Sequence, residues 1–375
     1  MFAWIVALAA LATLPACPAA RWSIRPTIEP VDLPIAYDLE DIELVCADAD
    51  GDRCEDVFAM SPALKRVIIF GGNRDAVIQP RGEIALPFRP VWLGVRDIDG
   101  DGVLDLVLLG SDRATILVVF LDSQLHERGR AETKHAAPIL GIVFASDRIG
   151  TRRSELVVID AAGGIEGHLL LWRGGALAPA GQFSIPGAGA PVCVAASAQN
   201  RDGRIRAWIA TSSRQLHEIE LGERSVATTK IADLESVPAG LAVGRFFDPN
   251  YESLLASYPE EHRTEVITVA PAPVEITTNA IAVRGEMPPI VVDANHDGRD
   301  DVISFDRWQS GGVATIACSE PIQKFVERKF TIYGAPPQFV VGDFDGSRTL
   351  RFFFLGHGPR SIAFATDRVE IERRP

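Results

Sequence analysis

The 375-residue chain carries 37 basic and 50 acidic residues, which gives a formal net charge of −13, and 47% of its residues are apolar. This composition excludes a disordered chain, which would be poorer in apolar residues. The acidic balance argues against nucleic acid as a partner, because phosphate backbones are bound by clustered Lys and Arg. Five cysteines are too few for a disulfide-dense miniprotein.

Residues 1–20 are predicted to be a signal peptide. The apolar run Phe2–Leu14 is too short to cross a bilayer, which takes about 20 residues, and small residues follow it, as in secretory signals. The segment ending at Cys17 also resembles a bacterial lipobox, in which the cysteine is acylated; ordinary cleavage just beyond it is the alternative. We therefore expect an exported protein, periplasmic, extracellular or at the cell surface, whose only membrane contact is a lipid on Cys17.

Three acidic segments share one nine-residue pattern, with carboxylate or amide oxygens at positions 1, 3, 5 and 9. They are Asp48–Asp56 (DADGDRCED), Asp97–Asp105 (DIDGDGVLD) and Asp293–Asp301 (DANHDGRDD). Degraded copies start at residues 147, 198, 245 and 343, so the spacings between successive copies are 49, 50, 51, 47, 48 and 50. Such even spacing indicates an internal repeat.

Each repeat contains about four short apolar runs separated by glycine and proline, without a helical period, which is typical of antiparallel strands. Four strands in about 48 residues are the signature of a propeller blade. The prediction is an all-β fold, a seven-bladed β-propeller of four-stranded antiparallel blades. Its parts are a lead-in at 21–40, with an outer strand that helps to close the ring, and blades at about 41–90, 91–139, 140–187, 188–238, 239–286, 287–335 and 336–375.

The oxygen-rich loops predict calcium, because calcium takes six to eight oxygen ligands in flexible geometry. The EF-hand shares the 1-3-5 spacing but needs a glutamate at position 12 and flanking helices, and this sequence has neither. Solvated acidic turns are the other alternative. The predicted side-chain ligands are Asp48, Asp50, Asp52 and Asp56; Asp97, Asp99, Asp101 and Asp105; Asp293, Asn295, Asp297 and Asp301; the backbone carbonyls of Cys54, Val103 and Arg299 would add to them. A weaker fourth site would use Asp343, Asp345 and Ser347, with Arg351 at position 9.

The D-x-D-G-D-G-x-x-D segment in a repeat of about 50 residues resembles the FG-GAP/VCBS repeat family, to which the integrin α-subunit propeller and many secreted or lipid-anchored bacterial proteins belong. The resemblance spans residues 41–375 and implies a seven-bladed propeller whose loops hold about three calcium ions. It also implies a surface protein that binds its partners through a propeller face.

Neither a catalytic motif nor a metal-binding histidine motif is evident in the sequence. The favoured function is therefore non-enzymatic binding of a protein or a glycan. Two alternatives stay open: an enzyme that acts on extracellular polysaccharide, such as a lyase, and a structural lipoprotein of the cell envelope. Trp92, Trp172, Trp208 and Trp308 are candidates for a sugar-stacking platform, with packing inside strands as the alternative. Cys46 and Cys54, which flank the first loop, are predicted to form a disulfide.

Overall fold

The computed structural model describes residues 21–25, 42–74, 78–145, 155–160, 164–197, 205–221, 226–261, 263–269, 275–279, 289–308, 311–320, 324–333, 339–347, 350–355 and 364–372. Apart from one 3-10 turn, η1 (Pro259–Glu261), the regular structure of this part is all β. Within it, no helix has the length and hydropathy needed to cross a membrane.

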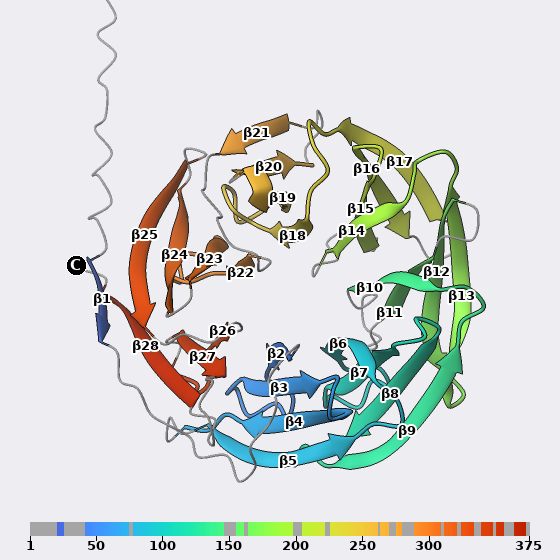
Figure 1. Cartoon of the computed structure of the whole chain (residues 1–375), viewed down its shortest axis with the longest axis horizontal. Coiled ribbons are helices and arrows are strands. Elements are labelled where there is room, and N and C mark those ends of the chain that lie inside the picture. The colour runs from blue at the N-terminus through green and yellow to red at the C-terminus, as the bar shows by residue number, and fades with distance from the viewer. Residues whose placement is uncertain are drawn as a thin grey trace, which may run out of the picture.

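The strands form four-stranded antiparallel sheets arranged around a common axis, so the predicted all-β propeller is confirmed (Figure 1). Six blades consist of four consecutive strands each. They are β2 (Glu43–Ala47), β3 (Asp56–Ser61), β4 (Arg66–Gly71) and β5 (Gln79–Ala85); β6 (Pro90–Arg96), β7 (Asp105–Gly110), β8 (Thr115–Leu121) and β9 (Glu127–Lys134); β10 (Ile139–Ala145), β11 (Glu155–Asp160), β12 (Ile165–Arg173) and β13 (Ala176–Ile185); β14 (Pro191–Ala196), β15 (Ile205–Thr211), β16 (Gln215–Leu221) and β17 (Val226–Asp233); β18 (Gly240–Gly244), β19 (Ser253–Tyr258), β20 (Arg263–Thr268) and β21 (Glu275–Asn279); and β22 (Ile290–Val292), β23 (Asp301–Trp308), β24 (Gly311–Glu320) and β25 (Lys324–Tyr333).

The last repeat departs from the prediction of seven equivalent blades. It supplies only three described strands, β26 (Phe339–Gly342), β27 (Arg351–Leu355) and β28 (Phe364–Glu372). The fourth strand of this sheet is β1 (Arg21–Arg25), which pairs antiparallel with β28, Arg21 opposite Glu372. The chain thus makes six blades from its repeats, not seven, and a composite sheet from its two ends. The physical reason is that β28 would otherwise expose an unpaired edge, and β1 pairs with that edge.

Blade-on-blade packing supplies the core. The second and third strands are buried along their whole length in blade 2, where every residue of β7 and β8 is buried. Apolar residues therefore run continuously instead of alternating, because both sheet faces are covered by neighbours. One core cluster joins blades 2 and 3, and another joins blade 1 to the composite sheet through Val57, Phe70, Val340 and Phe353.

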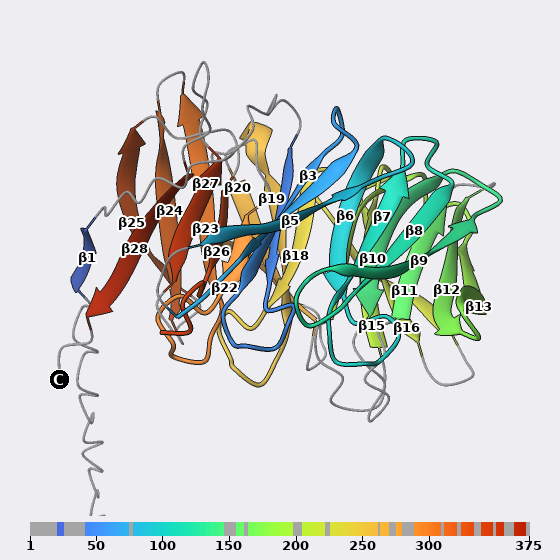
Figure 2. The ribbon, with the colours of Figure 1, turned by 90° about the horizontal axis from the view of Figure 1, so that it is seen from below.

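The ring has two faces, which the side view separates (Figure 2). On the first, here called the loop face, the first strand of a blade turns into the second, and the acidic loops lie there. On the second, called the entry face, the first strand begins and the second strand turns into the third. Because neighbouring strands are antiparallel, the residues at the start of β6 and the end of β7 share the entry face.

Candidate functional site

The three acidic loops, 48–56 (loop 1), 97–105 (loop 2) and 293–301 (loop 6), share one conformation. In each, the two carboxylate oxygens of the position-1 aspartate accept hydrogen bonds from amides later in the loop. These bonds join Asp48 to the amides of Gly51 (2.9 Å) and Arg53 (3.0 Å), Asp97 to those of Gly100 (2.7 Å) and Gly102 (3.0 Å), and Asp293 to those of Asp297 (3.1 Å) and Gly298 (2.9 Å). The aspartate therefore winds each loop around its own side chain.

Two positions of each loop, 4 and 6, have the left-handed backbone that glycine adopts most easily. Their φ angles are 80° and 73° at Gly51 and Arg53, 84° and 94° at Gly100 and Gly102, and 58° and 85° at His296 and Gly298. Gly51, Gly100 and Gly298 therefore suit the sharp turns of the three loops. The loops match at the level of the backbone, although their sequences differ at most even positions.

The position-9 aspartate anchors each loop to its blade. Asp56, Asp105 and Asp301 are buried, and each accepts two backbone hydrogen bonds. One bond comes from the amide at position 2 of the same loop, and the other from an amide at the carboxyl end of the third strand of the blade. The donors are Ala49 (3.0 Å) and Gly72 (3.0 Å) for Asp56, Ile98 (3.0 Å) and Leu121 (3.3 Å) for Asp105, and Ala294 (3.0 Å) and Ser319 (2.8 Å) for Asp301. Burial raises the pKa of each of these three carboxyl groups to about 7.

In loop 1, and separately in loop 2, three carboxylate oxygens lie close enough together to bind one ion. One carboxylate oxygen from each of Asp48, Asp50 and Asp52 lies within 4.8 Å of the others. In loop 2 the same holds for Asp97 and Asp99 together with Asp105 at position 9. Calcium–oxygen distances are about 2.3–2.6 Å, so oxygens on opposite sides of one ion are up to about 5 Å apart. The donor sets therefore fit calcium.

Arginines lie against several of these carboxylates. In loop 2, Arg128 contacts Asp99 (2.5 Å) and Asp101 (2.7 Å), and its side chain is 39% exposed. In the degraded copy at 343–351 (loop 7), by contrast, Arg351 is buried at position 9 and forms an ion pair with Asp345. A guanidinium fixed there supplies the positive charge that an ion would bring. Loop 7 is therefore less suited to a cation than loops 1, 2 and 6.

An acidic residue at position 8, which the ligand pattern does not include, links neighbouring loops. Glu55 of loop 1 donates its amide to the carbonyl of Asp343 (2.9 Å) and accepts the amide of Asp343 on its carboxylate (2.7 Å). Asp300 of loop 6 makes the same pair of contacts with Arg245, at 3.0 and 2.7 Å. In the degraded copy at 245–253 (loop 5), the carboxylate of Glu252 accepts a hydrogen bond from the hydroxyl of Ser197 (2.6 Å). The recurrence of an acidic residue at positions 55, 252 and 300 was the sequence signal that could have revealed these contacts.

Cys46 and Cys54 are not joined by a disulfide, so the predicted bridge between them is wrong. Both Cys46 and Cys54 are thiols in the structure. The Cys46 thiol donates to the carbonyl of Val341 in the composite sheet (3.3 Å). Cys54 is buried next to Gly346 of loop 7. The two side chains thus pack on the neighbouring sheet, and hydrogen bonds, not a covalent bridge, fasten loop 1.

The strands β6, β10 and β14 are the innermost strands of three neighbouring blades (Figure 1). At the entry face they carry a row of exposed aliphatic side chains. Each strand has a bulge near its start, and the extra residues are Val91, Leu140 and Val192. Their exposed fractions are 39%, 41% and 44%. A bulge re-aims the side chain that it carries. We call these three residues the bulge patch.

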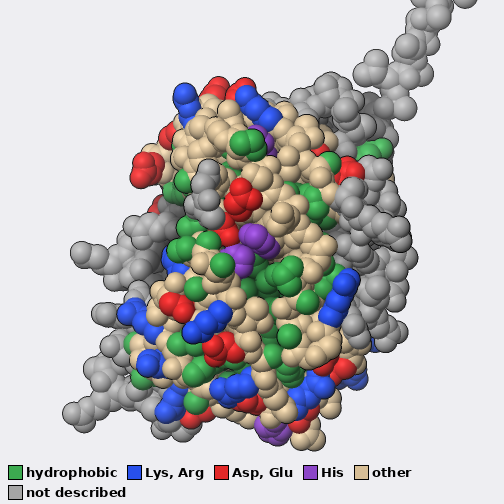
Figure 3. All heavy atoms as spheres, turned by 90° about the vertical axis from the view of Figure 1, so that its right-hand side faces the viewer, with side chains coloured by type: hydrophobic (Ala, Val, Ile, Leu, Met, Phe, Trp, Pro, Cys, Tyr) green, Lys and Arg blue, Asp and Glu red, His purple; other side chains and the backbone are tan. Residues whose placement is uncertain are grey.

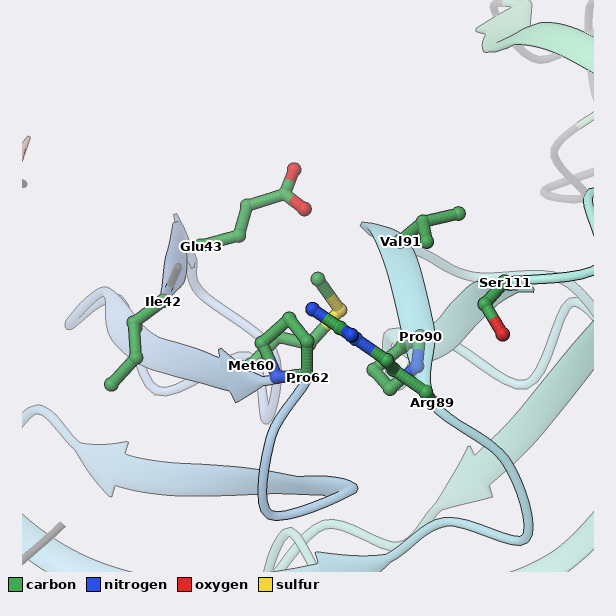
Figure 4. A pocket seen from close by; sticks show the side chains of 8 residues that line it. All are labelled: Ile42, Glu43, Met60, Pro62, Arg89, Pro90, Val91 and Ser111. Carbon is green, nitrogen blue, oxygen red and sulfur yellow. The ribbon is translucent and has the colours of Figure 1, made fainter. Parts of the chain in front are cut away.

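A cleft of about 510 Å³ adjoins the bulge patch at the entry face, between blades 1 and 2 (Figure 4). Val91 belongs to its lining, together with Ile42, Glu43, Met60, Pro62, Arg89, Pro90 and Ser111. Figure 4 shows the Arg89 side chain reaching between Pro62 and Pro90. Burial raises the pKa of Glu43 to about 7, and a hydrogen bond with the backbone of Leu93 opposes that rise.

The candidate tryptophans do not form a platform among the described side chains. Trp208 is fully buried. Trp92 packs on Phe144, and Trp172 packs on Phe120, with ring centroids 5.7 and 4.8 Å apart. The side chain of Trp308 lies outside the described residues. The packing alternative therefore holds for these three.

Comparisons with known proteins support the fold. No family model matches the chain, and no curated protein matches it. Among solved structures, BBS1N crystallised in complex with ARL6DN is similar with a TM-score of 0.59 at 13% identity, over 94% of this chain and 98% of that one. A mercury-soaked crystal of the same complex gives 0.60 over 92% and 98%. A functionally unknown protein from Desulfotomaculum acetoxidans gives 0.51 at 13% identity, over 78% and 90%. These likenesses establish that the chain is a β-propeller.

Proposed function

We propose that this protein is a non-enzymatic binding module that holds a protein partner on its entry face. The observation that carries the proposal is the bulge patch. Three neighbouring blades each turn an aliphatic side chain toward solvent at the same place in the fold, and Leu64 and Val237 (38% and 42% exposed) lie on the same face. Exposed apolar surface of this kind is typical of interaction sites.

The chemistry of the patch favours a protein over a glycan. Sugar-binding surfaces present exposed aromatic rings, whereas the large exposed side chains described on the entry face are valine and leucine. Aliphatic side chains contribute to binding mainly by the burial of apolar area, which a partner with its own apolar side chains provides. That the neighbour BBS1N was crystallised with ARL6DN is consistent with protein binding by a propeller of this shape.

Calcium would serve the loop face in this proposal. Loops 1, 2 and 6 would each hold one ion. In loops 1 and 2 the ion would offset the repulsion between carboxylates that lie within 4.8 Å of one another. Because position 8 of loops 1 and 6 bonds to the preceding loop, an ion that orders one loop also stabilises a blade junction. The FG-GAP/VCBS resemblance and the expected export to a calcium-rich compartment support this part of the proposal.

The test compares the two faces by crosslinking. A photo-reactive amino acid is placed at Val192 on the entry face or at Tyr251, which is 43% exposed in loop 5 on the loop face. The protein is expressed in its own cells, illuminated, and adducts are identified by mass spectrometry. We expect one protein adduct from position 192 that is absent from position 251. Adducts that are equal at both positions, or a glycan adduct, would contradict the proposal.

A further inference from the structure

Two histidines and an aspartate converge at the junction of blades 2 and 3. The Nε2 atom of His135 lies 2.6 Å from Oδ2 of Asp160, and Nε2 of His168 lies 3.2 Å from the same oxygen. The two imidazole rings meet edge to face with centroids 4.7 Å apart. One ligand atom from each residue falls within a span of 4.8 Å. Both rings thus direct a nitrogen toward one point.

Three separate segments bring these residues together. Asp160 ends β11, directly opposite Ile139, and His168 stands on β12 opposite Val158. His135 follows β9 in the connection from blade 2 to blade 3, and its amide is bonded to the carbonyl of Ala114 (2.8 Å). The cluster therefore lies where the two blades meet, beside the core that Val158 shares with blade 2. Its backbone positions are set by strand pairing and not by a flexible tip.

The burial gradient of the cluster suits an ion that enters from solvent. The Asp160 side chain is 2% exposed, that of His135 13%, and that of His168 27%. Figure 3 faces the side of the ring where β12 and β13 lie and shows histidine side chains at the surface beside acidic ones. The carboxylate is thus at the bottom of the site, and a histidine edge is accessible.

We propose that His135, Asp160 and His168 form a binding site for a divalent transition-metal ion of the zinc class. Imidazole nitrogen with carboxylate oxygen is a donor set that zinc and its neighbours prefer, whereas calcium prefers oxygen alone. With zinc about 2.0–2.1 Å from each ligand, tetrahedral geometry places ligand atoms about 3.3 Å apart. The His168 distance already matches, and the His135 ring needs a shift of about 0.7 Å. Three protein ligands leave further coordination positions for water or a partner's side chain.

This site is distinct from the acidic loops in place and chemistry. The loops lie on the loop face, whereas Asp160 is at the end of β11 that pairs with the start of β10, next to the bulge at Leu140. An ion held here would link the connection after β9 to β11 and β12. It would therefore stabilise the junction of blades 2 and 3 and stand close to the bulge patch.

Cobalt(II), which reports its coordination through visible absorption, is the probe. The full-length protein is titrated with Co²⁺ in buffer that contains excess calcium, so that the acidic loops are occupied, and zinc is then added to displace cobalt. We expect one equivalent with the absorption of nitrogen-ligated cobalt, displacement by zinc, and a higher melting temperature with zinc. His135→Ala and His168→Ala should each weaken binding at least about tenfold.

His126→Ala is the matched control, because His126 is 62% exposed in blade 2, where it lies near Asp122. This variant should bind cobalt as the natural protein does. Both test positions are partly exposed, so circular dichroism can verify that the variants fold. The proposal is overturned if the natural protein binds no cobalt in calcium buffer. Binding that is unchanged in both test variants, or equally weakened in the control, overturns it as well.

Discussion

Removal of the Glu55 side chain tests how the ring is closed. Glu55 belongs to blade 1, and its carboxylate accepts the amide of Asp343 in the composite sheet at 2.7 Å. Gly342 leaves room for the Glu55 carboxylate, because a Cβ at this position would collide with it. The bond joins residues 288 positions apart in the chain. Glu55→Ala therefore removes a contact between the first blade and the last sheet.

The expected size follows from the burial of the bond. A hydrogen bond to a charged group contributes about 1.5–3 kcal/mol, and its loss also leaves a partly buried amide without this acceptor. Burial raises the pKa of Glu55, and the charges of Asp343 and Asp48 raise it further, so relief of that repulsion offsets part of the loss. The net expectation is a decrease of about 1–2 kcal/mol in the free energy of unfolding.

Glu83→Ala is the matched control in the same blade. Glu83 pairs with Arg66 at 2.9 Å, but both side chains are about 40% exposed (42% and 41%). Exposed ion pairs contribute about 0–1 kcal/mol. Urea unfolding at pH 7 without calcium compares the two variants. The reasoning is refuted if Glu55→Ala costs no more than Glu83→Ala.

Three further predictions concern other parts of the fold. Glu43→Gln should leave stability unchanged near pH 4 and raise it near pH 8 by about 3 kcal/mol, at about 1.4 kcal/mol per pKa unit. The folded-state pKa of about 7 lies above the ordinary 4.5, so folding stability is lost between these two pH values, where Glu43 is ionised in the unfolded chain but still protonated in the folded one. A pH-independent effect in thermal melts would contradict this. Gly102→Ala should cost about 1–2 kcal/mol, since its φ is 94°, whereas Gly82→Ala, in open space on β5, should be neutral or slightly stabilising; equal urea midpoints for the two would refute the role of the loop backbone. Val91→Asp, at a 39% exposed position, should change stability by less than about 0.5 kcal/mol but abolish the adduct from position 192; an adduct that persists would place the partner elsewhere.

Local patterns were predictable from the sequence. The predicted ligands at positions 1, 3, 5 and 9 are neighbours in the chain, so their spacing determines the turn. The nearly constant repeat length indicated four-stranded units, because each of the first six repeats forms one complete blade. The degraded copy that starts at Arg245 also fell in the correct frame, as its contact with Asp300 demonstrates.

Long-range pairing was not predictable in the same way. An outer strand from residues 21–40 was expected to help close the ring, but nothing in Arg21–Arg25 indicates that it pairs with residues 368–372, so that pairing followed only from the structure. The bulges at Val91, Leu140 and Val192 depend on a one-residue shift between paired strands, which the hydrophobic pattern of one strand does not encode. The histidine and aspartate cluster draws on three segments, so no motif spacing could reveal it.

The most direct test is a calcium titration of the full-length protein that counts the bound ions, together with thermal unfolding in calcium and in chelator. It tests whether loops 1, 2 and 6 hold ions that stabilise the ring. An ion that binds only the folded state must raise the melting temperature. We expect about three calcium ions per chain, a clearly higher melting temperature in calcium than in chelator, and the loss of one ion in Asp97→Asn. No bound calcium and identical melting in chelator would contradict this expectation and would make the acidic loops ordinary turns.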